Sequence, residues 1–287
     1  MNTKHIGFLH PGLMGVSLAA TAKNTGHTTY WVSKDRSKNT CDRAEKHSLV
    51  TVQSVEELCD KCSVIISACP PHAATNVAGK VLTCSFKGIY ADLNAISPQK
   101  VKRIGQLMNN AGVEFVDGGI IGPPAWRPES TWLYLSGHTA SQVAECFTGG
   151  PLGVEVIGDE IGKASAVKMC FAANTKGTTA LLCAIVAAAE RMGVRGELEK
   201  QWSRHGSDFA QNTLTRISGV TAKAWRFSGE MEEIASTLEE AGLPRGFHLA
   251  ASDIFQRIAK FKDFDPYPPV EDILDALLNP DPTISGY

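Results

Sequence analysis

The chain has 287 residues, of which 43% are hydrophobic and 20% are charged, and its formal net charge is −2 at pH 7. This length is enough for one large domain or two ordinary domains with sizeable cores. The near-neutral charge gives no electrostatic reason for a nucleic-acid partner, and we predict none. We find no apolar run of membrane-spanning length and no targeting peptide, so we expect a cytoplasmic protein without a membrane partner.

The first predicted element is a short buried strand over residues 6–9, followed by a turn and an alanine-rich helix that begins near Leu13. This order is typical of a dinucleotide-binding unit, in which the phosphates lie at the helix N-terminus. Gly12 would let the backbone approach a pyrophosphate, and Gly15 would let the helix pack close to the strand. We expect the cofactor to contact the turn and the first helical residues, namely His10, Pro11, Gly12, Leu13 and Met14.

His10 stands where the fingerprint G-x-G-x-x-G has its first glycine. Histidine is among the residues that tolerate unusual backbone angles, so the turn can still form. The alternative is a glycine-containing strand–helix turn that binds no nucleotide. The position of the turn between a strand and a helix, with a second strand starting near residue 28, favours binding.

The second predicted strand, Thr28–Val32, ends in a hydroxyl and two cations, those of Ser33, Lys34 and Arg36. Folds specific for NAD place an acidic residue near this point to hold the ribose 2′-hydroxyl. A hydroxyl with two cations suits a 2′-phosphate instead, so we predict NADP(H) as the cofactor and NAD(H) as the less favoured alternative.

Strands alternate with helices up to about residue 157, which predicts a mostly parallel sheet. Further strands are expected at 63–67, from Gly88, from Phe115 and at 132–136. Asn94 follows one of these strands, where ligands bind in open α/β sheets, and we expect it to touch the nicotinamide or the substrate.

The character of the sequence changes after residue 158. No proline occurs from Asp159 to Arg191, and the stretch is mostly apolar, so we predict one long helix that is buried on several sides and lies at a subunit interface. The remainder, to about residue 278, is predicted helical with breaks at Gly193, Gly219, 242–244 and 266–269. The fold class is therefore α/β: a Rossmann-type domain over 1–158, then an all-α substrate and dimerisation domain over 159–287, led by the long interdomain helix.

The eight cysteines are scattered, and Cys59 and Cys62 form the one Cys-x-x-Cys motif. No second cysteine pair or closely spaced histidine pair completes a zinc set. We predict reduced thiols and no metal site.

Three segments resemble the β-hydroxyacid dehydrogenase superfamily, which includes 6-phosphogluconate dehydrogenase and the imine reductases. These segments are 7–15, with its Leu-Met-Gly ending, 117–122, which resembles the substrate loop of the family, and 158–168, which resembles the helix start that carries the catalytic lysine. The tail from 222 to 248 looks like a distinct C-terminal branch. The resemblance implies a two-domain subunit, a homodimer built on the long helix and an active site between domains.

The resemblance assigns Lys168 as the catalytic general acid/base, because it matches the catalytic lysine of the family. Desolvation on an apolar helix face would lower the pKa of such a lysine and let it exchange a proton near neutral pH. The alternative is a lysine whose charge reaches solvent at the helix start. Gly119 falls in the substrate loop, and Lys176, two turns beyond Lys168, would be a second cation for a substrate carboxylate or phosphate.

The chain departs from the family pattern at the substrate site. Phe171 and Ala172 stand where the family has asparagines, and Ile121 stands where its substrate loop has a serine. The leading hypothesis is an NADP(H)-dependent oxidoreductase that interconverts a small hydroxy acid or alcohol and its carbonyl compound. The alternatives are an imine reductase and an NADP(H)-binding sensor without catalysis.

Overall fold

The computed structural model describes residues 3–262 and 264–281. The chain forms two compact units, Met1–Met169 and Cys170–Tyr287. The division falls eleven residues beyond the domain boundary that the sequence suggested at residue 158, because the start of the following helix is bonded to the sheet. The predicted boundary at residue 158, between a cofactor-binding and a substrate domain, stays a prediction.

The first unit is built on one eight-stranded sheet with the order β3-β2-β1-β4-β5-β6-β7-β8. Neighbouring strands are parallel except for β6 and β7, which are antiparallel. The order reverses between β1 and β4, which makes the crevice beyond their carboxyl ends the expected ligand site of a Rossmann fold. The strands are β1 (His5–Phe8), β2 (Thr28–Val32), β3 (Val50–Val52), β4 (Val64–Ser67), β5 (Ile89–Asp92), β6 (Glu114–Ile121), β7 (Trp132–Ser136) and β8 (Gly153–Val156).

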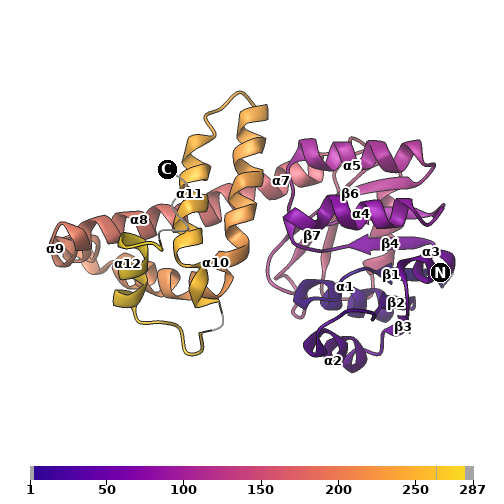
Figure 1. Ribbon diagram of the computed structural model, residues 1–287, viewed down its shortest axis with the longest axis horizontal. Coiled ribbons are helices and arrows are strands. Elements are labelled where there is room, and N and C mark those ends of the chain that lie inside the picture. The colour runs from indigo at the N-terminus through magenta and orange to yellow at the C-terminus, as the bar shows by residue number, and fades with distance from the viewer. Residues whose placement is uncertain (1–2, 263, 282–287) are drawn as a thin grey trace. The chain divides into compact units, whose positions relative to one another are not determined.

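Helices cover both faces of this sheet (Figure 1). Buried side chains of β4 alternate between the two cores: Val64 and Ile66 belong to one apolar cluster and Ile65 to the other. Burial on both faces explains why this strand is a continuous apolar run. One face carries α1 (Leu13–Asn24), α2 (Lys38–Lys46) and α6 (Ala140–Ala144); the other carries α3 (Val55–Lys61), α4 (Ala74–Leu82) and α5 (Pro98–Asn110).

The described part of the second unit is helical. α7 (Lys163–Ala172) begins in the first unit and leads through a π-helical turn, η3 (Ala173–Gly177), into α8 (Thr178–Arg191), so the long predicted helix is confirmed but starts at Lys163. The other helices of this unit are α9 (Arg195–Trp202), α10 (Phe209–Glu240), α11 (Gly246–Arg257) and α12 (Val270–Leu278). Short 3-10 turns are η1 (Pro71–Ala73), η2 (Glu145–Phe147), η4 (Arg204–Gly206) and η5 (Ala259–Phe261).

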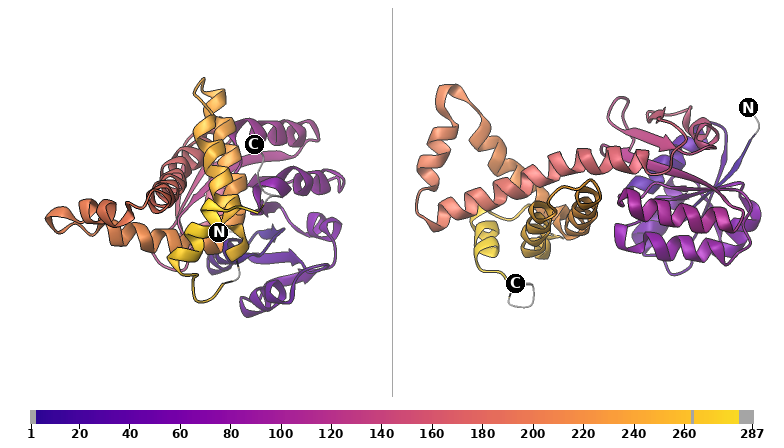
Figure 2. Two further views of the ribbon diagram at one scale, coloured as in Figure 1. Left: turned by 60° about the vertical axis from the view of Figure 1, so that its left-hand side comes forward. Right: turned by 90° about the horizontal axis from the view of Figure 1, so that it is seen from above.

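Gly219 does not interrupt a helix, so the helix break predicted at this residue is wrong. α10 is 32 residues long, contains this glycine in its interior and packs along α11 (Figure 2). A glycine inside a helix costs about 1 kcal/mol, and the burial of ten α10 side chains outweighs that cost.

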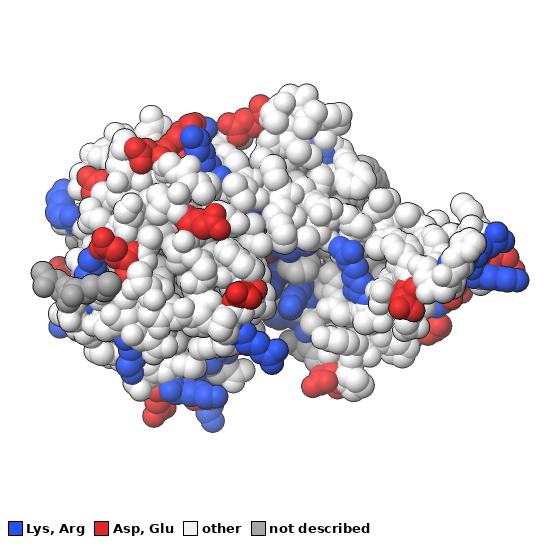
Figure 3. Space-filling view, turned by 180° about the vertical axis from the view of Figure 1, so that it is seen from behind, with Lys and Arg blue, Asp and Glu red and all other residues white. Residues whose placement is uncertain are grey.

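The stretch Lys163–Arg191 is long and apolar enough to cross a membrane, judged by length and composition alone. The expectation that no stretch has this length is therefore wrong. Of its most apolar window, 44% is buried within the protein, and the core helix of a soluble protein meets the same criterion. Acidic and basic side chains are both scattered over the face drawn in Figure 3.

Candidate functional site

The turn between β1 and α1 has the geometry of a phosphate site. A Cβ added to Gly12 would meet nothing within 4 Å, whereas a Cβ on Gly15 would lie 2.2 Å from the carbonyl oxygen of His10. No side chain caps the N-terminus of α1 in the described part of the chain. No side chain of the described residues therefore occupies the hydrogen-bonding position of the helix N-terminus, where an anion can bind.

His10 fits this turn without glycine-like backbone angles, because it is not among the described residues with positive φ. Burial lowers the pKa of His10 to about 4, and the charges of Arg36 and Lys80 add to the effect. Its ring is therefore neutral at pH 7. A glycine is not needed at this position.

Arg36 reaches back from the loop after β2 to the dinucleotide turn. Its Nη2 donates a hydrogen bond of 3.2 Å to the carbonyl oxygen of Leu9, the residue after β1. Lys34 is exposed, and Ser33 is half-buried with its N–H bonded to the carbonyl oxygen of Val52 at 3.1 Å. The structure thus brings Arg36 beside His10, while Lys34 lies at the surface.

Gly119 and Lys168 lie together in the first unit. A Cβ on Gly119 would lie 2.5 Å from the carbonyl oxygen of Ala164 and 3.0 Å from Cβ of Lys168, so only glycine lets α7 approach β6 this closely. Lys168 itself is half-buried. In the β5–β6 register Asp92 is opposite Asp117, so Gly119 lies beyond the carboxyl end of β5.

Asp117 holds the start of α7 on the sheet, a role that the sequence did not reveal. Its fully buried carboxylate accepts hydrogen bonds from the N–H groups of Gly162 (2.9 Å) and Ser165 (3.0 Å) and from the hydroxyls of Ser165 (2.6 Å) and Ser136 (3.1 Å). These bonds satisfy N–H groups of the first helical turn. Asp117 therefore fixes the helix that carries Lys168.

Asn94 is buried and occupied by structural hydrogen bonds. Its Oδ1 accepts from the N–H of Cys69 at 2.5 Å, and its Nδ2 donates to the hydroxyl of Ser67 at 3.1 Å. The side chain thus ties the loop after β5 to the end of β4. Its contact with substrate or nicotinamide stays a prediction, and the geometry favours a supporting role.

Lys176 lies in the π-helical turn of the second unit, and its partners are there too. Its ammonium pairs with Glu230 of α10 and lies 4.3 Å from the ring centre of Phe227. Burial lowers the pKa of Lys176, and Glu230 opposes this shift. His248 of α11 packs on the same turn, since a Cβ on Gly177 would lie 3.0 Å from its Nε2. π-turns are frequent at functional sites.

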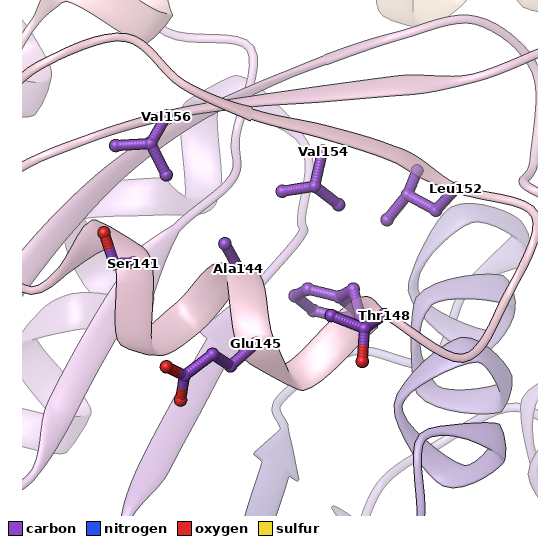
Figure 4. A pocket seen from close by; sticks show the side chains of 8 residues that line it. Ser141, Ala144, Glu145, Thr148, Leu152, Val154 and Val156 are labelled. Atoms are coloured by element: carbon purple, nitrogen blue, oxygen red, sulfur yellow. The ribbon is translucent and has the colours of Figure 1, made fainter.

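A hollow of about 430 Å³ lies along the edge strand of the sheet (Figure 4). Leu152, Val154 and Val156 of the β8 segment point across it toward α6 and η2. Its lining is mostly apolar and contains none of the predicted site residues.

Burial raises the pKa of the Cys59 and Cys62 thiols to about 12, so neither is a thiolate at neutral pH. All eight cysteines are free. Within residues 3–262 and 264–281, no group of three or more His, Cys, Asp and Glu side chains is placed to hold a metal ion.

The Rossmann topology and the open turn at Gly12 together define a dinucleotide-binding protein. Residues 5–146 match the model of the NAD binding domain of 6-phosphogluconate dehydrogenase, and residues 189–258 match a domain of unknown function, DUF1932. The chain belongs to the 6-phosphogluconate dehydrogenase-like superfamily, as a member with a DUF1932 helical domain. The resemblance seen in the sequence is confirmed.

Two curated relatives match over much of the chain. An uncharacterized 28.5 kDa protein of Methanothermus fervidus is 30% identical over 232 residues, which are 80% of this chain and 88% of the relative. The mitochondrial 3-hydroxyisobutyrate dehydrogenase of Drosophila melanogaster is 23% identical over 194 residues, which are 67% of this chain and 58% of that protein.

Solved structures give the same fold. A conserved protein described as similar to 3-hydroxyacid dehydrogenases has 28% identity and a TM-score of 0.64, over 88% of this chain and 97% of its own. The Mycobacterium tuberculosis 3-hydroxyisobutyrate dehydrogenase with L-serine has 17% identity and a TM-score of 0.70, over 96% and 99%. An Aspergillus terreus reductive aminase with NADPH and ethyl levulinate has 14% identity and a TM-score of 0.55, over 96% and 99%. Among the similar proteins that carry the name of an enzyme are 3-hydroxyisobutyrate dehydrogenases and a reductive aminase.

Proposed function

We propose that the protein is an NADP(H)-dependent oxidoreductase that interconverts a small hydroxy acid or alcohol and its carbonyl compound. The observation that carries the proposal is the placement of Lys168 against Gly119, beyond the carboxyl end of β5. Ligands of open α/β sheets bind beyond these strand ends, so a lysine there is within reach of a bound substrate. Its helix start is fixed by a buried carboxylate, as a positioned proton donor requires.

In this proposal the cofactor pyrophosphate lies on the first turn of α1, next to Gly12, where there is room for it. His10, Pro11, Leu13 and Met14 surround it. Ser33, Lys34 and Arg36 hold the ribose 2′-phosphate, and the position of Arg36 beside the turn supports NADP(H) over NAD(H). When bound, the nicotinamide supplies or accepts the hydride.

Lys168 donates a proton to the substrate oxygen during reduction and takes it back during oxidation. Asp117 positions the lysine by fixing α7. Asn94 supports the pocket by holding two strand ends together. Lys176, with Glu230 as its counterion, is the proposed site for an anionic substrate group, which would compete with Glu230 for the ammonium.

An imine is the second candidate substrate. Ile121, Phe171 and Ala172 cannot donate the side-chain hydrogen bonds that would hold a hydroxy acid, and this favours a less polar substrate. Retention of Lys168 favours carbonyl chemistry, which is why the imine ranks second.

We also propose a cytoplasmic homodimer. Eight free cysteines are consistent with a reducing compartment. Large apolar side chains of the second unit are exposed, as at a subunit interface, including Leu181, Met192, Phe209 and Phe247.

The first experiment is a titration with NADPH and with NADH, followed by tryptophan fluorescence. We expect NADPH to bind more tightly, and Lys34→Ala/Arg36→Ala to weaken NADPH at least about tenfold with little effect on NADH. Lys61→Ala/Arg103→Ala, the same charge loss elsewhere, is the control. Failure of both nucleotides to bind would refute the proposal.

The second experiment measures turnover of 3-hydroxy acids and of cyclic imines. Lys168→Gln should lower kcat for hydroxy acids by about 10²–10⁴-fold, the usual contribution of a general acid/base. Lys163→Gln, on the same helix but exposed, should leave kcat unchanged. Turnover of imines alone would select the second candidate, and tight NADPH binding without any turnover would select the sensor.

A further inference from the structure

A second hollow of about 450 Å³ lies in the first unit, among α1, α2 and the loop that joins β6 to β7. Apart from Leu13, none of its residues belongs to the predicted cofactor or substrate site. We call it the α1–α2 hollow, and it is lined by Leu13, Val16, Arg43, Lys46, His47 and Trp126.

One wall of the α1–α2 hollow is apolar and firmly held. Leu13 is 65% exposed and Trp126 is 47% exposed, which is unusual for two large apolar side chains that share one hollow. The Trp126 ring stacks on His47 with 4.9 Å between centroids. The N–H of Ala125 donates to the Ser17 hydroxyl at 3.0 Å, which fastens the loop to α1. The wall is therefore in place before any ligand arrives.

Two cationic residues contribute to the largely apolar lining of the α1–α2 hollow. Arg43 and Lys46 line it, and Lys23 reaches the carbonyl oxygen of His47 at 3.3 Å. In the part of the chain that the structure describes, no carboxylate forms an ion pair with any of these three cations. Arg43 donates to the hydroxyl of Thr40 at 3.0 Å, while its buried Nε has no hydrogen-bond partner.

The lysine charges act on His47, which lines the hollow. Burial lowers the pKa of His47, and the charges of Lys46 and Lys23 lower it further. Both effects favour the neutral form of the histidine, and the positive charge of the site comes from Arg43 and the lysines. An unopposed pair of cations beside an exposed apolar wall suits a ligand that carries both an anion and a hydrocarbon body.

We infer that the α1–α2 hollow binds a small organic anion, of the class of aromatic or branched monocarboxylates. The carboxylate would meet Arg43 and Lys46, and the body would pack on Trp126 and Leu13. The volume lies in the range of small-molecule sites. An inorganic anion would leave the apolar wall wet, and a neutral hydrocarbon would leave the cations unpaired.

Occupancy has a consequence for the cofactor site, and this part rests on the proposed function. Leu13 is the first residue of α1, the helix whose N-terminus would hold the pyrophosphate. A ligand that contacts Leu13 should therefore change NADPH affinity, and NADPH should change its affinity by the same factor.

The binding itself is tested without nucleotide. Protein labelled with 5-fluorotryptophan carries five reporters, and Trp126→Phe assigns the resonance of Trp126. Titration with 2-naphthoate should shift this resonance in a saturable way and leave the other four unmoved. The uncharged 2-naphthamide, with the same body, should bind at least about tenfold more weakly. Equal affinity of the two compounds, or no shift, overturns the inference.

A matched pair of variants on α2 locates the anion. Lys46→Gln removes a cation of the hollow and should weaken 2-naphthoate about two- to fivefold, the range of one exposed ion pair. Lys38→Gln removes an exposed lysine outside the lining and should change affinity by less than about twofold. Equal effects of the two variants contradict the assignment. A parallel NADPH titration separates failure here from failure of the oxidoreductase proposal.

Discussion

The hydroxyl of Ser165 donates a hydrogen bond of 2.6 Å to the carboxylate of Asp117, across 48 residues of sequence. This bond and its neighbours join the first turn of α7 to strand β6, and Lys168 lies one turn further along the helix. The position of the proposed proton donor is thus set by a buried carboxylate on another element.

Asp117→Asn should destabilise the first unit. The amide would place an N–H₂ group where the carboxylate accepts bonds from two backbone N–H groups and two hydroxyls. Each buried donor that is left without a partner lowers the free energy of unfolding by about 1–3 kcal/mol. Urea-induced unfolding measures the change, with Ser165→Ala, which removes one donor, as the milder comparison. An unchanged unfolding midpoint would contradict the anchoring role.

Gly12 and Gly15 should respond in opposite ways to alanine. Gly15→Ala puts a Cβ 2.2 Å from the carbonyl oxygen of His10, and we expect a loss of about 1–3 kcal/mol in the free energy of unfolding. Gly12→Ala meets nothing within 4 Å, so folding should be preserved while NADPH affinity falls. Thermal unfolding and nucleotide titration of both variants check this. Normal NADPH binding by Gly12→Ala would place the phosphates elsewhere.

Asp92 should make the protein less stable as the pH rises. Burial raises the pKa of Asp92 to about 7, whereas the pKa of an aspartate in the unfolded chain is about 3.9. Between these values the unfolded chain releases a proton that the folded chain keeps, so the stability contributed by this group is present at low pH and is lost up to about pH 7.

Asp92→Asn removes this dependence. The stability of the wild type relative to the variant should fall by about 1–4 kcal/mol between about pH 4 and pH 8. Urea unfolding of both proteins across this range is the measurement. Parallel pH profiles would show that Asp92 titrates normally.

Glu230→Gln should be more harmful than removal of the whole ion pair. The substitution leaves the buried ammonium of Lys176 without its counterion, which typically costs about 3–5 kcal/mol. Lys176→Met/Glu230→Gln removes both charges and should recover most of that loss. Chemical denaturation of the single and double variants decides the matter, since additive losses would mean that the pair is not coupled.

Local sequence was sufficient for much of the fold. Thr28–Val32 and Trp132–Ser136 are strands with the predicted bounds, because β-branched and aromatic residues there are flanked by polar turns. The close approach at Gly15 also followed from the sequence, since the strand–turn–helix unit is short and its geometry is local; the pyrophosphate contact of Gly12 stays a prediction. The long helix from Lys163 was visible as an apolar stretch without proline.

Sequence alone failed where distant segments meet. Gly219 was expected to break a helix, but packing of α10 along α11 outweighs its local preference. The ligand contact expected of Asn94 stays a prediction, but spacing along the chain did not reveal that its amide bonds to Cys69 and Ser67 at the end of β4, 25 and 27 residues away.

The sequence by itself determined the order of elements, the dinucleotide turn and the superfamily, because these depend on residues that are neighbours along the chain. Only the tertiary structure decided that Asp117 anchors the helix of Lys168 and that Glu230 is the partner of Lys176. The partner of Lys176 is 54 residues away. Hydrogen bonds and ion pairs act over a few ångströms in space, so their partners are fixed by the folded chain and not by spacing along it.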